Sequence, residues 1–132
     1  MADEQAVLAA NEAFYRAFTA GEAQAMDELW ARHAPVACIH PGWPPLSGRA
    51  EVMRSWRAIL TEGPRRIRCH EPRVHLLGEA ALVTCLEALD EGLLAAANLF
   101  VREGGSWKIV HHQAGPMALS TATGEAGGGR LH

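Results

Sequence analysis

The chain has 132 residues, of which 48% are hydrophobic and 20% are charged, and its formal net charge is −3. This length fits one domain, and the hydrophobic fraction is enough for a core, which excludes a generally disordered chain. Neither sign of charge dominates and no apolar run approaches the ~20 residues of a membrane-spanning helix, so we expect neither a nucleic acid nor a membrane as partner. The acidic start, Met1 to Gln5, lacks the pattern of a signal peptide, and we expect a soluble, cytoplasmic protein.

The first half of the chain has the apolar spacing of helices. Hydrophobic residues three and four positions apart predict a helix over residues 3–21 and a second over 22–32. Residues 36–40 are typical of a short strand, and the Pro-rich stretch 41–45 predicts a rigid loop. A third helix is expected over 48–60, ended by the Gly-Pro pair that follows.

In the second half the apolar period falls toward 2, which is typical of strands. Strands are expected over residues 67–77, 80–89, 93–102 and 107–114. The links between them are short and contain glycine, and such links favour antiparallel hairpins. Helices followed by strands indicate the α+β class, with three N-terminal helices packed on a curved antiparallel sheet that encloses a space for a small ligand.

The end of the chain has a different composition. Residues 118–132 are small, polar and rich in glycine, so we expect one domain over 1–117 followed by a flexible tail over 118–132.

Cysteines and basic residues give no sign of a metal or nucleic-acid site. Cys38, Cys69 and Cys85 form no Cys-x-x-Cys pair, and we interpret them as reduced, buried thiols. The chain has no His-Glu-x-x-His motif and no Gly-rich phosphate loop, so neither a metal nor a cofactor is expected. The basic stretch 65–75 has no aromatic residue on which a base could stack, and we interpret it as a solvated strand edge.

Three polar residues stand where chemistry would be possible. His40 ends the first predicted strand before Pro41, and it is either a general acid or base or a structural histidine. Glu87 lies in an apolar strand, either facing water or on an apolar face, where its pKa would be raised. Asn98 interrupts another apolar strand, and it either binds a neighbouring side chain or donates to a ligand.

His111 and His112 are adjacent in the last predicted strand. Successive side chains of a strand point to opposite faces, so at most one of the two enters an enclosed space. The other is expected to face solvent or an interface. The sequence alone leaves both assignments open.

Several of these segments together resemble a known family. The chain is similar to the SnoaL-like, ketosteroid-isomerase-like branch of the nuclear-transport-factor-2 superfamily over about residues 6–117. The segments that carry the resemblance are Phe14-Tyr15-x-Ala17-Phe18, Leu29-Trp30, Ile39-His40-Pro41-Gly42, Ser47-Gly48-Arg49, Ser55-Trp56, Asn98-Leu99-Phe100-Val101-Arg102 and Trp107-Lys108-Ile109-Val110-His111-His112. This pattern is specific for a fold and not for a reaction.

The resemblance implies a cone-shaped fold with a pocket, and a homodimer that pairs through the outer face of the sheet. His40 stands where ketosteroid isomerases have their catalytic aspartate, and Asn98 stands where they have a second aspartate that an apolar site keeps protonated. Counting from the glycine that ends the first helix places Phe14, with Tyr15 as the alternative, at the position of their tyrosine. The pocket-facing residue of the last strand is expected to be His112, with His111 possible.

These implications make a small carbonyl compound the expected ligand. Without the family's aspartate and with its phenol expected to be missing, the chain is not a standard ketosteroid isomerase, and the enzyme hypothesis is a cofactor-independent isomerase, cyclase or dehydratase. His40 would move a proton, Asn98 would stabilise an oxyanion, and Glu87 or His112 would orient either of them. The alternative is a non-catalytic module that binds a ligand or dimerises. The expected pocket walls are Trp30, Trp43, Trp56, Cys85, Phe100 and Met117.

Overall fold

The computed structural model describes residues 2–118 and contains three helices and six strands. The helices are α1 (Ala2–Ala20), α2 (Ala23–Leu29) and α3 (Arg49–Thr61). The strands are β1 (Ala37–Ile39), β2 (Leu46–Ser47), β3 (Arg68–Leu77), β4 (Ala80–Leu89), β5 (Gly92–Glu103) and β6 (Ser106–Pro116). The expected α+β architecture is therefore confirmed.

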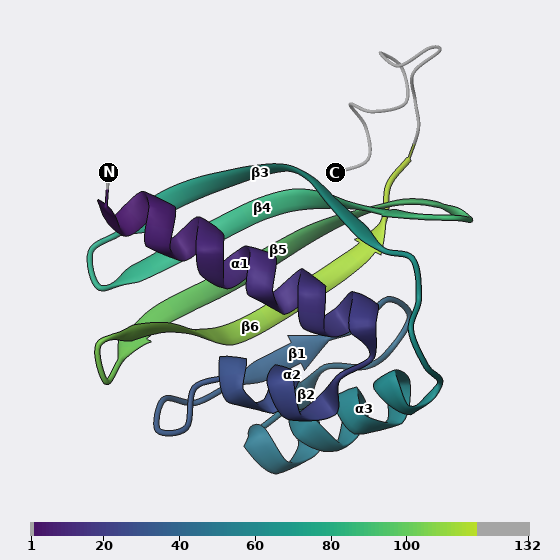
Figure 1. The fold of residues 1–132 in the computed structure, drawn as a ribbon, viewed down its shortest axis with the longest axis horizontal. Coiled ribbons are helices and arrows are strands. Elements are labelled where there is room, and N and C mark those ends of the chain that lie inside the picture. Colours follow the sequence, from purple (N-terminus) through teal and green to yellow (C-terminus); the bar gives the residue numbers. More distant parts are fainter. Residues whose placement is uncertain (1, 119–132) are drawn as a thin grey trace.

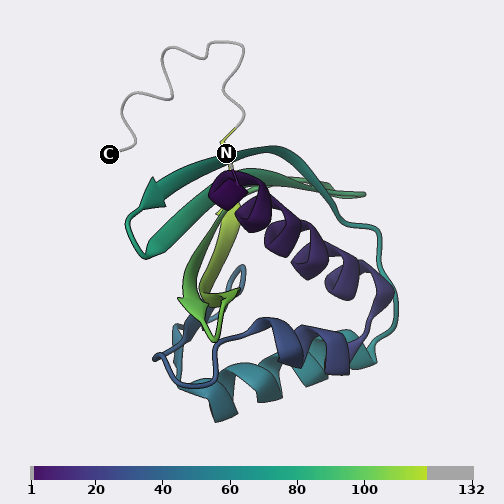
Figure 2. The same ribbon diagram turned by 60° about the vertical axis from the view of Figure 1, so that its left-hand side comes forward.

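The six strands form one sheet in the order β2-β1-β6-β5-β4-β3 (Figure 1). Strands β3 to β6 are joined by hairpins and pair antiparallel, whereas β1 runs parallel to β6. Helix α1 crosses the inner face of the curved sheet, and α2 and α3 lie together at the end where β1 and β2 pair (Figure 2). The sheet and the helices thus enclose the interior from two sides.

The second helix is shorter than its sequence predicts. It ends at Leu29 because Trp30 turns to extended backbone and bridges to Ile109 of β6. The carboxylate of Glu103 then accepts hydrogen bonds from the backbone N–H groups of residues 32–34. These contacts hold the segment after α2 against the sheet and prevent a further helical turn.

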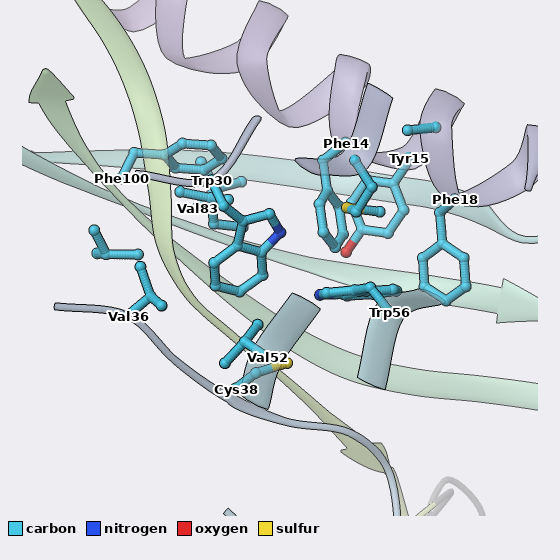
Figure 3. Packing of buried hydrophobic residues seen from close by; sticks show 14 of the residues in the cluster. Phe14, Tyr15, Phe18, Trp30, Val36, Cys38, Val52, Trp56, Val83 and Phe100 are labelled. Carbon is cyan, nitrogen blue, oxygen red and sulfur yellow. The ribbon is translucent and has the colours of Figure 1, made fainter. Parts of the chain in front are cut away.

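One end of the interior is filled by hydrophobic side chains (Figure 3). Trp30, Phe100, Val83 and Ile109 are at most 1% exposed, and we call the part of the core that they form the closed end. Phe14 meets the ring of Trp56 edge to face, with 5.5 Å between their centroids. Contacts of this kind fix the distance between α1, α3 and the sheet.

A bulge in β6 decides which of its residues face the interior. Leu99 of β5 pairs with His111 and Phe100 pairs with Ile109, so Val110 is an extra residue in β6. Regular alternation would bury residues 109 and 111 on the same face. Because of the extra residue, Ile109 and His112 are both buried, at 0% and 1% exposure.

Other findings concern the surface and the ends of the chain. Within residues 2–118, no helix is long and apolar enough to cross a membrane. The three cysteines are free thiols. The predicted flexible tail lies, apart from the exposed Ala118, outside the residues that the structure describes.

Candidate active site

A cavity of about 330 Å³ lies at the end of the interior opposite the closed end. It is bounded by the inner face of the sheet, the loop after β1 and the connection from α3 to β3. Its lining residues are Phe18, His40, Pro41, Trp43, Ile59, Glu62, Arg65, Ile67, Glu87, Leu89, Leu94 and His112. His40, Glu87 and His112, three of the candidate catalytic residues, therefore line the same cavity.

His40 directly follows β1 and its ring is 3% exposed. Its Nε2 lies 2.9 Å from Ser55 Oγ, which itself donates to the carbonyl of Val52. Because the Ser55 proton is used in that bond, the network assigns the His40 proton to Nε2 and leaves a lone pair on Nδ1, which lies 3.9 Å from Cys38 Sγ. Burial lowers the pKa of His40 from 6.5 to about 4, so the ring is neutral at neutral pH.

Aromatic rings hold His40 from two sides. The Trp43 ring lies 4.9 Å from the His40 ring and the Trp56 ring 4.8 Å from it, both edge to face. Trp56 comes from α3 and is buried, whereas Trp43 lies in the Pro-rich loop and is 41% exposed. His40 is thus fixed between a core residue and a residue at the rim of the cavity.

Glu87 faces the interior because alternate residues of β4 do so. The Tyr15 hydroxyl donates to its Oε2 at 2.6 Å. Within residues 2–118 the other oxygen, Oε1, has no hydrogen-bond partner. Burial raises the pKa of Glu87, and the hydrogen bond from Tyr15 lowers it by a smaller amount. The carboxyl group therefore holds its proton at a higher pH than an exposed glutamate does.

His112 lies on β6 beside Glu87. Its Nδ1 is 2.6 Å from Asn98 Oδ1, and its Nε2 is 3.8 Å from Glu87 Oε2. Burial, and then the neighbouring His40 and His111, lower the pKa of His112 to about 3. The ring is therefore neutral, with its proton on Nδ1 and a lone pair on Nε2.

Asn98 lies behind the cavity in a buried network of side chains. Its Nδ2 donates to Asn11 Oδ1 at 2.9 Å and to the Tyr15 hydroxyl at 3.2 Å. Both amide protons are thereby used, so Oδ1 must accept the Nδ1 proton of His112. Asn98 is fully buried and is not among the residues that line the cavity. Its contacts set the orientation of His112 and Tyr15.

The expected pocket walls divide into two groups. Trp43 lines the cavity, as does His40 beneath it. Trp30 and Phe100 belong to the closed end, Cys85 lies behind Glu87 with its Sγ 3.4 Å from the Tyr15 hydroxyl, and Trp56 supports the His40 ring from α3. The remaining expected wall residue, Met117, is half-buried beyond the end of β6 and is absent from the lining.

Two members of the network were not predicted from the sequence. Counting from Gly21 favoured Phe14 over Tyr15, and the conclusion that no phenol stands here was wrong, because the Tyr15 hydroxyl contacts Glu87 and Asn98. Asn11 was not considered at all. A signal was present, since Asn11 lies four residues after Val7 on the apolar stripe of α1, where a polar side chain needs a buried partner.

The residues described contain no group of three or more histidine, cysteine, aspartate or glutamate side chains arranged to hold a metal ion. His40, Glu87 and His112 line the same cavity. They bring a neutral imidazole and a buried carboxyl group with a raised pKa to one space. This arrangement offers a base and an acid to one small molecule.

Comparisons with known proteins agree with this architecture. A family model described as a SnoaL-like domain matches residues 7–119. A search of curated proteins gave no match.

The solved structures that resemble this chain include proteins with different proposed functions. A proposed dehydratase of the nuclear-transport-factor-2-like family from Streptomyces avermitilis is 36% identical, with a TM-score of 0.81 over 89% of this chain and 97% of that one. A proposed association domain of calcium/calmodulin-dependent protein kinase type II from Thiobacillus denitrificans is 31% identical, with a TM-score of 0.70 over 83% and 94%. A proposed ketosteroid isomerase from Parabacteroides distasonis is 14% identical, with a TM-score of 0.69 over 86% of each chain, and shows similarity of fold alone.

Proposed function

The chain belongs to the family of SnoaL-like domains, and from that premise we propose that it is an acid–base enzyme for a small carbonyl compound. The reaction is the dehydration of a β-hydroxy ketone, supplied entirely by side chains of the chain. The observation that carries the proposal is the shared cavity of His40, Glu87 and His112. The similarity to a proposed dehydratase supports the reaction class.

The first step is enolisation. His40 Nδ1 removes the proton from the carbon beside the carbonyl, and Glu87 Oε1 donates its proton to the carbonyl oxygen. Burial favours the required state of both groups, because it lowers the pKa of His40 to about 4 and raises the pKa of Glu87. The result is an enol, a protonated His40 and an ionised Glu87.

The second step expels water and restores the enzyme. The enol returns its proton to Glu87 as the carbonyl reforms, and the electron pair forms a carbon–carbon double bond while the bond to the β-hydroxyl breaks. The departing hydroxyl takes the proton from His40 and leaves as water. His112 and Tyr15 keep the Glu87 carboxyl in place during both proton transfers.

The two steps can be tested with two phenyl ketones. In D₂O, the protein should exchange the α-hydrogens of 4-phenylbutan-2-one, measured by NMR. It should also convert 4-hydroxy-4-phenylbutan-2-one to the conjugated enone, measured by ultraviolet absorbance. His40→Gln and Glu87→Gln should each lower the rates by about 10²–10⁴-fold, the usual contribution of a positioned acid or base.

Two exposed residues give matched controls for these variants. His75→Gln on β3 and Glu79→Gln in the turn before β4 change the same residue types outside the cavity, and both should retain the wild-type rates. If the wild-type protein exchanges the α-hydrogens no faster than buffer does, or if His40→Gln is as active as wild type, the enzyme proposal is wrong.

A second candidate function is association with another copy of the chain. The outer face of the sheet carries apolar side chains on β4 and β5, among them Leu82, Leu86 and Leu99, which remain half-exposed. The 31% identity to a proposed association domain favours this function. Sedimentation should show a dimer that Leu86→Lys converts to a monomer, and a wild-type monomer would exclude it.

A further inference from the structure

One charged side chain at the cavity has no role in the proton transfers. Arg65 lies in the connection between α3 and β3 and contributes to the lining, and its side chain is 37% exposed. Its backbone N–H donates to the carbonyl of Thr19 at the end of α1, at 3.2 Å. The main chain at Arg65 is therefore anchored while the guanidinium group reaches the mouth of the cavity.

The guanidinium group of Arg65 is only partly satisfied. Its Nη2 donates to Glu62 Oε1 at 3.1 Å, and the Glu62 side chain is 72% exposed. Its Nε is buried and has no hydrogen-bond partner among the described residues. An exposed ion pair of this kind contributes little stability, so a competing carboxylate displaces Glu62 at little cost.

Apart from Arg65, no described residue that lines the cavity carries a positive charge that could pair with an anionic ligand. Its apolar wall is made of Phe18, Ile59, Ile67, Leu89 and Leu94. His40 and His112 are neutral at neutral pH, and Glu87 is a carboxylic acid in the proposed cycle. An anionic group on a ligand therefore meets no fixed negative charge in the interior, and its favourable position is at Arg65.

We propose that the cavity takes a keto acid, whose carboxylate binds the Arg65 guanidinium in place of Glu62 while its ketone lies between His40 and Glu87. A guanidinium group presents parallel N–H donors that fit both oxygens of a carboxylate. Once the side chain turns from Glu62 toward the cavity, Nε and Nη2 supply these two donors. This inference rests on the proposed function for the position of the ketone, whereas the carboxylate site is independent of it.

The test uses 4-oxo-4-phenylbutanoate and its primary amide, which have the same shape and differ in charge. Titration calorimetry should show that wild-type protein binds the acid at least tenfold more tightly than the amide. Arg65→Gln should remove this preference and leave amide binding unchanged. Glu62→Gln, which removes the competing carboxylate, should strengthen binding of the acid.

Two further variants sharpen the result. Arg66→Gln changes the neighbouring exposed arginine, which does not line the cavity, and should keep the preference. Arg65→Lys keeps the charge without the paired donors and should keep only part of the preference. Equal binding of acid and amide by the wild type, an unchanged preference in Arg65→Gln, or no binding of either compound would overturn the proposal.

Hydrogen exchange separates this proposal from the proposed function. If both compounds bind equally and both exchange their α-hydrogens through His40, the carboxylate site is wrong and the acid–base function stands. If the acid is preferred through Arg65 but neither compound exchanges above the buffer rate, the carboxylate site stands and the catalytic function fails.

Discussion

The two ends of the core are built on the same strands but differ in the chemistry of their inward-facing side chains. At the closed end, Trp30, Phe100 and Ile109 are buried and do not line the cavity. At the other end, Glu87 and His112 lie at the same depth in the sheet but face a cavity. Both ends are buried, so burial alone does not distinguish packing residues from site residues.

The two ends also differ in how much their side chains contribute to the free energy of unfolding. Apolar side chains stabilise the fold when they are removed from water, whereas buried polar groups do so only when each is hydrogen-bonded. The closed end therefore offsets the cost of burying the His40 ring and a carboxyl group on Glu87 that is only partly hydrogen-bonded. Substitutions at the two ends test this division, beginning with the largest expected effect.

Removing a large side chain from the closed end should cost the most stability. Phe100→Ala is expected to lower the free energy of unfolding by about 3–5 kcal/mol, because it leaves a cavity where the neighbours cannot close in. Denaturant unfolding measures this. Leu93→Ala, at an exposed position of the same strand, is the control and should cost less than ~1 kcal/mol. A similar loss for both variants would contradict the division.

The network behind the cavity should be nearly as sensitive. Asn98→Leu is expected to lower the free energy of unfolding by about 2–4 kcal/mol, because Asn11 Oδ1 and the Nδ1 proton of His112 lose their partners. In a double-mutant cycle, Asn11→Leu should restore part of the loss by removing one orphaned group. Full additivity of the two changes would show that the hydrogen bond between them carries no stability.

The end of the interior that contains the cavity should also make the stability of the fold depend on pH. His40 and His112 are neutral in the fold but protonated below pH 6.5 when unfolded, so each makes stability rise with pH between its folded pKa and 6.5. Glu87 has the opposite effect above its unfolded pKa of 4.5, because it keeps a proton only in the fold. Between about pH 5 and 6 the slope is therefore smaller than the roughly two protons, or about 2.7 kcal/mol per pH unit, that the two histidines alone would contribute.

Glu87→Gln separates these opposing contributions. It removes the contribution of Glu87, which falls with pH, so the slope between about pH 5 and 6 should steepen toward about 2.7 kcal/mol per pH unit. Urea unfolding at several pH values measures both slopes. A slope that stays the same in Glu87→Gln would mean that Glu87 is ionised in the fold, and it would remove the proposed acid.

The rim of the cavity should show the smallest effect on stability. Trp43→Ala is expected to change the free energy of unfolding by about 0.5 kcal/mol or less, since the side chain is 41% exposed. It should nevertheless weaken binding of 4-phenylbutan-2-one several-fold, because its ring closes the cavity beside His40. Unchanged binding in this variant would show that the ligand lies deeper than the rim.

Most of the fold could be predicted because its signals are local. Apolar periodicity and glycine-containing links place β3 to β6 within about two residues of their bounds. The end of α2 could not be predicted, since it depends on Glu103, which contacts residues 32–34 from more than sixty positions away. The two-residue strand β2 exists only because β1 lies beside it.

The site was predictable in part. His40 and Glu87 were singled out because each is a polar residue in an apolar strand or at its end, whereas only the resemblance favoured His112 over His111. Tyr15 was named only as the alternative to Phe14, because a one-residue error in counting along a helix turns the expected side chain by about 100°. Asn98 donates to Asn11 within a buried network instead of to a ligand. No pattern in the sequence pairs these two residues.

The bulge at Val110 means that backbone register, rather than residue type, selects the histidine in the cavity. If Val110 were instead paired as a regular strand residue, Ile109 and His111 would share the inward face and His112 would turn outward, whereas deleting Val110 would keep His112 inward. An alignment of relatives by residue identity alone would pair these histidines without regard to the face that each occupies. A one-residue shift of register in the last hairpin would thus change the lining of the cavity, although no residue type is altered.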